Sequence, residues 1–149
     1  MSSFSASTLA SLSRAEWHAG RTTGTLSYRL CLAAEGYAWF PAVATFLGEF
    51  GGLVLKFPDK SGKLDTLHFN ACEASAGVDA RWVRDDYALR IGNSKLCVIG
   101  AAYSDHLLLF MDNAGRVYGG YDDFLCEVAG SGPEAIEALV SNHPLPEIQ

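Results

Sequence analysis

Long hydrophobic runs are missing from this chain, which argues against a membrane-spanning helix. The longest stretches without a charged residue are 13 residues, at Met1–Ser13 and Gly36–Gly48, whereas a spanning helix needs about 20 apolar residues. The first basic residue is Arg14, so the N-terminus lacks the basic start and apolar run of a secretory signal. We therefore expect a cytoplasmic protein with no membrane partner.

Motifs for disulfides, metals and phosphate are also missing. The four cysteines contain no C-x-x-C pair, and the four histidines contain no H-x-x-x-H or H-E-x-x-H arrangement. The glycine pairs at 51–52 and 119–120 match no phosphate-binding loop and are typical of turns or bulges. We expect free thiols, no metal and no cofactor. A Cys–His nucleophilic pair formed only in space stays open, without any local signature to favour it.

Positive charge is scarce, above all in the last third of the chain. The net charge is −6. From Gly100 onward there are eight acidic residues, Asp105, Asp112, Asp122, Asp123, Glu127, Glu134, Glu137 and Glu147, against the single base Arg116. Such a field repels phosphate backbones and attracts basic partners. We expect no nucleic-acid partner and, if any, a basic protein partner.

What the sequence does contain is the composition of one globular domain spanning residues 1–149, with 49% hydrophobic residues. The clearest element is a helix over about 41–50, in which Val43, Phe46, Leu47 and Phe50 follow the i, i+3, i+4, i+7 spacing of a buried face. Gly51 or Gly52 can adopt the left-handed conformation that ends it. A weaker helix is predicted over 5–17. Thr25 is an N-cap candidate for a helix in which Leu26, Leu30 and Ala33 share a face and which Gly36 ends.

The second half of the chain predicts mainly antiparallel strands. Leu53–Phe57 and Leu64–Phe69 form an expected hairpin, and Leu96–Ala101, Leu107–Asp112 and Arg116–Gly120 an expected meander with a turn at Asp112–Gly115. Residues 78–91 predict a helix ended by Gly92-Asn93. Ser131 and Glu134 match a capping box for a last helix, which Pro144 and Pro146 follow. This order of elements predicts an α+β fold, a mainly antiparallel sheet flanked by helices.

Two pairs of neighbouring acids are the candidate functional residues, at Asp85-Asp86 and Asp122-Asp123. Paired carboxylates can act as general acid and base when burial separates their pKa values, but adjacent residues usually point to different sides and form a solvated face. Tyr118 and Tyr121 distinguish the second pair, because tyrosine offers contact area with a polar tip and acids select a basic partner. We predict a docking surface of Tyr118, Tyr121, Asp122 and Asp123, helped by Asp85, Asp86 and Asp105.

Several motifs taken together resemble the SUKH superfamily of bacterial immunity proteins, and within it the third SUKH subfamily. They are Trp17–Arg21, Ala34–Tyr37, Phe46–Leu53, Val98–Gly100, Leu109–Asp112 followed by Gly115–Tyr118, and Gly130–Ile136. Their order and spacing carry the resemblance across nearly the whole chain. Most of these motif residues are typical of scaffold positions, with Arg21 as a candidate for capping or clamping the next helix.

The resemblance implies an α+β immunity protein that binds and blocks a cognate protein toxin of a polymorphic toxin system, often a nuclease or another nucleic-acid-modifying enzyme. It implies no catalytic residues, and we expect a monomer. The alternatives are a regulatory or adaptor domain of the same fold that binds a cellular protein and, less favoured by the spacing of acids, His and Cys, an enzyme. Lys56, Lys60 and Lys63 make one edge basic, either for a different partner or to prevent sheet-to-sheet aggregation.

Overall fold

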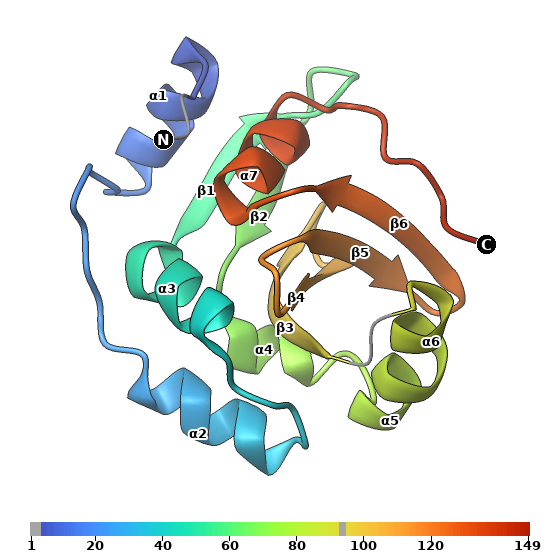
Figure 1. Ribbon diagram of the computed structural model, residues 1–149. Helices are drawn as coiled ribbons and strands as arrows, with labels where there is room; N and C mark the ends of the chain where they lie inside the picture. The colour runs from blue at the N-terminus through green and yellow to red at the C-terminus, as the bar shows by residue number, and fades with distance from the viewer. Residues whose placement is uncertain (1–3, 93–94) are drawn as a thin grey trace.

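A computed structural model describes residues 4–92 and 95–149 of the chain. Its six strands form one antiparallel sheet whose spatial order, β1 to β6, is the order of the sequence (Figure 1). The strands are β1 (Val54–Pro58), β2 (Leu64–His68), β3 (Leu96–Ala102), β4 (Leu107–Asp112), β5 (Val117–Tyr121) and β6 (Phe124–Ala129). The helices are α1 (Ala6–Arg14), α2 (Leu26–Ala34), α3 (Pro41–Phe50), α4 (Ala71–Ser75), α5 (Ala80–Trp82), α6 (Ala88–Arg90) and α7 (Gly132–Val140), with a π-helical turn, η1 (Val83–Tyr87), joining α5 to α6. The predicted α+β fold with helices flanking an antiparallel sheet is confirmed.

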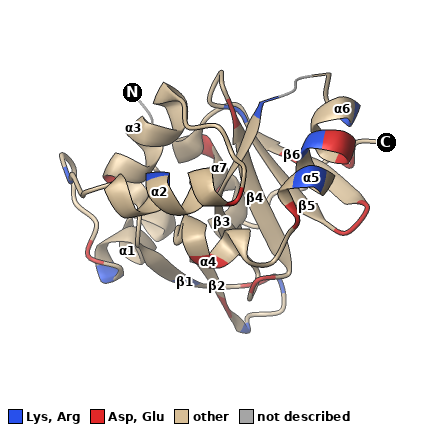
Figure 2. Cartoon of the chain, turned by 90° about the horizontal axis from the view of Figure 1, so that it is seen from below, with Lys and Arg blue, Asp and Glu red and all other residues tan. Residues whose placement is uncertain are grey.

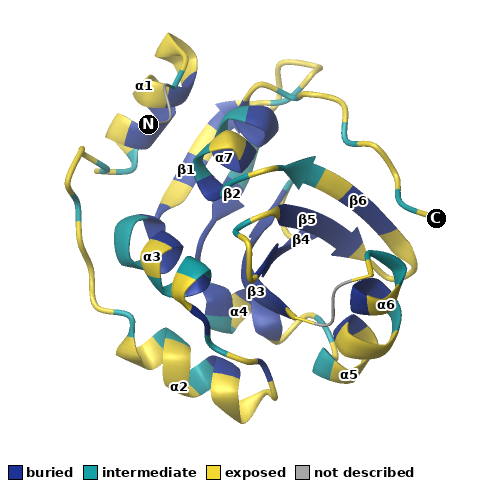
Figure 3. Cartoon of the chain, in the orientation of Figure 1, coloured by how far each residue is buried: buried dark blue, intermediate teal, exposed yellow. Residues whose placement is uncertain are grey.

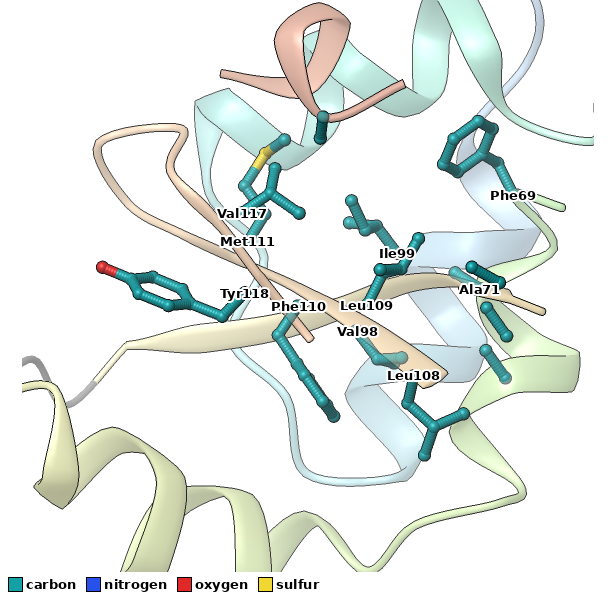
Figure 4. Packing of buried hydrophobic residues seen from close by; sticks show 14 of the residues in the cluster. Phe69, Ala71, Val98, Ile99, Leu108, Leu109, Phe110, Met111, Val117 and Tyr118 are labelled. Carbon is teal, nitrogen blue, oxygen red and sulfur yellow. The ribbon is translucent and has the colours of Figure 1, made fainter. Parts of the chain in front are cut away.

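Helices cover both faces of the central strands, so β3 and β4 are buried along their whole length (Figure 3). Met111 and Val117 point toward one side of the sheet and Phe110 and Leu108 toward the other (Figure 4). On the second side the ring of Phe110 meets the ring of Tyr87, which η1 supplies, at a centroid distance of 5.5 Å. The 71–91 segment is therefore one of the two layers that enclose the sheet.

The predicted helix over 41–50 is α3, and its predicted face is the buried one. Gly52 takes the left-handed conformation, with φ +84°, in the corner after the helix. Arg21 then holds this corner from outside, because its guanidinium donates to the main-chain oxygens of Glu49 and Gly51. The sequence predicted a contact with the next helix, which is α2; Arg21 instead binds the free carbonyls at the end of α3.

Main-chain groups at the two edges of the sheet are partly covered. At the β1 edge, the Ser11 hydroxyl of α1 donates to the Lys56 carbonyl at 3.3 Å. At the β6 edge, the chain after α7 returns, and the Ile148 N–H donates to the Leu125 carbonyl at 2.7 Å. Covering an edge limits pairing with other chains. The exposed Lys56 side chain lies on this same β1 strand, which fits the aggregation-preventing interpretation of the lysines.

Other sequence predictions meet mixed outcomes. The hairpins at 53–69 and 107–120, the capping box at Ser131 and the end of α2 just before Gly36, which has φ +98°, are confirmed. Thr25 precedes α2 but makes no side-chain capping bond. The face of Leu26, Leu30 and Ala33 is exposed, whereas Leu32 is buried. Gly92 and Asn93 were predicted to end the helix over 78–91. Gly92 has φ +69°, and Asn93 lies outside the described residues.

Candidate protein-binding site

The turn between β5 and β6 lies against the helical segment 80–90 and carries two of the predicted acids. Tyr121 pairs with Phe124 across the turn, which leaves Asp122 and Asp123 at its tip. Asp122 has φ +51°, a conformation that Asp and Asn tolerate better than most residues. Figure 2 shows this acidic turn beside the helical segment 80–90, which carries arginines on α5 and α6 and two neighbouring acids on η1.

Three side chains of the helical segment hold the turn through its backbone. The Trp82 indole Nε1 donates to the Asp122 carbonyl at 2.9 Å, and the Tyr87 hydroxyl donates to the same oxygen. Arg90 Nη1 donates to the Asp123 carbonyl at 2.8 Å. Because the carbonyls face the helical segment, the turn is fixed without using its carboxylates. In the described part of the chain, no hydrogen bond or ion pair engages the carboxylate of Asp122 or Asp123.

A groove of about 480 Å³ lies between this turn and the segment that follows α4. Its lining consists of Gly77, Val78, Asp79, Trp82, Leu108, Tyr121, Asp122 and Asp123. Trp82 is 42% exposed and Tyr121 49% exposed, whereas Leu108 is buried beneath them. We call this surface the acidic-aromatic groove. It combines rigid aromatic area with negative charge, the combination that suits a basic protein partner.

The remaining predicted residues occupy other surroundings. Tyr118 is only 8% exposed, so it offers a partner little area and we leave it out of the proposed contact surface. Asp86 is half-buried and pairs with Arg90 at 3.0 Å, which makes it a support for the turn. Asp85 is exposed, and hydrogen bonds from Arg84 hold the pKa of its carboxyl below the usual range.

Asp105 lies away from the groove lining, against β2. Its carboxylate is 2.9 Å from His68 Nε2. Together with Glu73 they form a group whose possible metal-ligand atoms lie within 4.8 Å of one another, which the sequence spacing could not reveal. However, the Asn70 N–H donates to His68 Nδ1 at 3.1 Å, so Nδ1 is unprotonated and Nε2 carries the proton of the neutral ring. A metal on Nε2 would need a lone pair there, so the arrangement fits a hydrogen-bonded clasp.

That clasp explains an unusual backbone. Tyr103, Ser104 and Asp105 all have positive φ, between +54° and +68°. The Ser104 hydroxyl donates to Asp65 at 2.9 Å, and the His68 contact holds Asp105. Such conformations persist where the surroundings over-determine them. Asp105 therefore stabilises the β3–β4 connection.

The two buried cysteines, Cys97 and Cys126, are unsuited to act as nucleophiles. All four are free thiols, as expected. Burial raises the pKa of Cys97 to about 12 and that of Cys126 to about 11. Thiols with such values stay protonated near neutral pH and are poor nucleophiles.

The sequence predicted one of the two aromatic residues that line the groove. Tyr121 was expected, whereas Trp82 and Asp79 were not assigned to the site. Trp82 stands 40 positions before Asp122, and their contact depends on how the helical segment packs over the sheet. The signal that could have indicated Trp82 is a tryptophan among five charged residues in 81–90, an unusual place for a core side chain.

The described residues thus form an antiparallel sheet flanked by helices, with the acidic-aromatic groove on its surface. The family model for the SUKH-3 immunity protein matches residues 4–142, and the chain belongs to that family. The resemblance stated from the sequence is thereby confirmed. Neither a curated protein nor a solved structure matches the chain. Within the described ranges, no helix is long and apolar enough to cross a membrane.

Proposed function

We propose that this protein neutralises a basic toxin domain by binding it through the acidic-aromatic groove. Membership of an immunity protein family implies a toxin-neutralising, non-enzymatic role. The observation that supports the groove as the contact surface is the turn of Asp122 and Asp123, whose backbone is held by three donors while both residues are exposed. Preorganised charge of this kind raises association rates and selects a partner of opposite sign.

A nuclease or another nucleic-acid-modifying toxin is the target we infer. Enzymes that act on nucleic acids present basic grooves for the phosphate backbone, and an acidic domain can occupy such a groove. The net charge of −6 supports this choice. We further propose that the protein acts as a monomer in the cytoplasm and blocks the toxin's active site within a polymorphic toxin system.

Co-expression with a cognate toxin domain tests the proposal. The wild-type protein should restore growth and form a stoichiometric complex in gel filtration. The double variant Tyr121→Ala/Asp122→Asn should bind the toxin more weakly, since it removes contact area and charge but keeps a residue that tolerates positive φ. Survival without complex formation would reject inhibition by binding. Complex formation unaffected by the double variant would reject the groove as the contact surface.

A further inference from the structure

The acidic-aromatic groove is large enough to receive a long side chain from a partner, and its lining is apolar, aromatic and acidic. Its volume of about 480 Å³ falls within the range of about 300–1,000 Å³ that small-ligand sites occupy. Leu108 and Val78 contribute apolar surface, Trp82 and Tyr121 contribute exposed rings, and the turn contributes carboxylates. An occupant must therefore combine an apolar stem with a head that suits both aromatic faces and negative charge.

The charge balance of the lining is negative. Asp79 is engaged by Arg81, with Arg81 Nη2 3.2 Å from Asp79 Oδ2. Asp122 and Asp123 have no such partner among the described residues, so two uncompensated carboxylates remain at the rim. These carboxylates would repel an anion, and a neutral apolar ligand would leave them without a partner. The lining thus selects a cation.

The indole of Trp82 narrows the choice further. Its N–H is already donated to the Asp122 carbonyl, so the ring faces, rather than the polar edge, are what the indole can offer a ligand. A cation over an aromatic face is attracted by the negative charge of the ring face. Planar guanidinium stacks on such rings and also forms paired hydrogen bonds with carboxylates, whereas ammonium is a compact and strongly hydrated charge.

From these features we infer that the groove binds the side chain of an arginine on the partner toxin. The inference rests on the proposed function and specifies its chemistry. The aliphatic stem of the arginine lies over Leu108 and Val78, and its guanidinium contacts the rings of Trp82 and Tyr121 and the carboxylates of Asp122 and Asp123.

Small probes test this without the toxin. The probes are N-acetyl-arginine amide, the corresponding citrulline amide, which is nearly isosteric and uncharged, and the corresponding lysine amide. Each is titrated into ¹⁵N-labelled full-length protein while amide and indole resonances are followed. The Trp82 indole signal is identified with Trp82→Phe. Arginine amide should move this signal and the amides of Tyr121–Asp123 in a saturable way, citrulline amide should not, and lysine amide should bind more weakly.

Charge variants make the test specific. Asp122→Asn/Asp123→Asn should weaken arginine-amide binding by about fivefold or more, as expected from the loss of two exposed ion pairs. The control Glu16→Gln/Glu127→Gln removes the same charge from exposed positions outside the groove lining and should leave the affinity unchanged. Equal binding of arginine and citrulline amides, or equal loss in both double variants, would overturn the inference.

The two proposals can fail separately. If the toxin forms a complex that the groove variants weaken, while arginine amide shows no groove-specific shifts, the proposed function stands and the arginine assignment is wrong. If arginine amide binds as described but no toxin complex forms, the groove chemistry stands and its occupant is not a toxin.

Discussion

The indole Nε1 of Trp82 and the carbonyl oxygen of Asp122 lie 2.9 Å apart, although 40 positions separate the two residues. This hydrogen bond joins the helical layer to the tip of the β5–β6 hairpin. It fixes one wall of the acidic-aromatic groove through the backbone of the turn, in which Asp122 and Asp123 are both exposed.

Trp82→Phe tests whether this bond organises the groove. The substitution keeps an aromatic ring and removes the donor, so the free energy of unfolding should fall by about 1 kcal/mol and toxin affinity should fall as well. Denaturant unfolding and calorimetric titration measure the two effects. Trp39→Phe is the control, because half-buried Trp39 does not line the groove. Equal toxin affinity in wild type and Trp82→Phe would contradict this role of the bond.

Gly120→Ala tests the packing of the helical layer against β5. A Cβ at Gly120 would lie 2.7 Å from the ring of Tyr87, and this overpacking should cost about 2–3 kcal/mol of unfolding free energy. Gly48→Ala is the matched control, since a Cβ in this position of α3 meets nothing within 4 Å. It should stabilise the protein by about 0.5–1 kcal/mol because alanine favours helix. Similar unfolding midpoints for the two variants would argue against the Tyr87 contact.

Arg21→Lys tests the clamp on α3. The guanidinium donates through two nitrogens to the carbonyls of Glu49 and Gly51, and lysine cannot reproduce that fork. We expect the free energy of unfolding to fall by about 1–2 kcal/mol. Arg29→Lys, at an exposed position of α2, should have little effect. The clamp would be disproved by two variants of equal stability.

The lowered pKa of Glu137 predicts how the free energy of unfolding depends on pH. Burial raises the pKa of its carboxyl, but hydrogen bonds from the Ser141 hydroxyl, the Ser5 N–H and the Thr8 hydroxyl outweigh burial and lower that pKa from 4.5 to about 2. Because the folded value lies below the unfolded one, this contribution is fully present above about pH 4.5 and is lost as the pH falls toward 2. Glu137→Gln should therefore be less stable than wild type at neutral pH.

The difference between wild type and Glu137→Gln should shrink as the pH falls from about 4.5 to about 2. Unfolding by urea at a series of pH values measures it. Glu127→Gln, at an exposed position on β6, controls for the loss of one negative charge. A difference that stays constant through this window would show that Glu137 does not hold α1 to α7 as a charged group.

The hydrogen bond between His68 and Asp105 predicts that Zn²⁺ does not change the thermal stability of the protein. Because His68 Nε2 carries a proton that is directed at Asp105, added Zn²⁺ should leave the thermal unfolding midpoint unchanged, and a chelator should have no effect either. His68→Gln should lower the midpoint with or without the metal. A rise on adding Zn²⁺ to the wild type that disappears in His68→Gln would instead establish a metal site.

Regular patterns in the sequence predicted much of the fold. The spacing of Val43, Phe46, Leu47 and Phe50 indicated the buried face of α3, and the capping box at Ser131 indicated the start of α7. Two elements were missed. The first is the strand β6, whose preceding turn contains no glycine to mark it. Asp122 takes the positive φ of that turn instead. The helix α4 spans only Ala71–Ser75, too short for its periodicity to be recognised.

The candidate site was less predictable, for a physical reason. The acids of the turn were found because they adjoin a strand rich in tyrosine, yet the burial of Tyr118 depends on which face of β5 meets the core. Trp82 and the clasp at Asp105 depend on contacts between segments far apart in the chain. Such contacts arise from the packing of layers and leave no periodic signal in the sequence.

Calorimetric titration of the purified toxin domain into wild type, Asp122→Asn/Asp123→Asn and the control Glu16→Gln/Glu127→Gln tests the central claim most directly. We predict one-to-one binding that weakens with added salt and falls at least about tenfold in the groove variant, as loss of two charged contacts allows, while the control binds like wild type. Absence of toxin binding by the wild type, or equal affinity of all three proteins, would contradict the account.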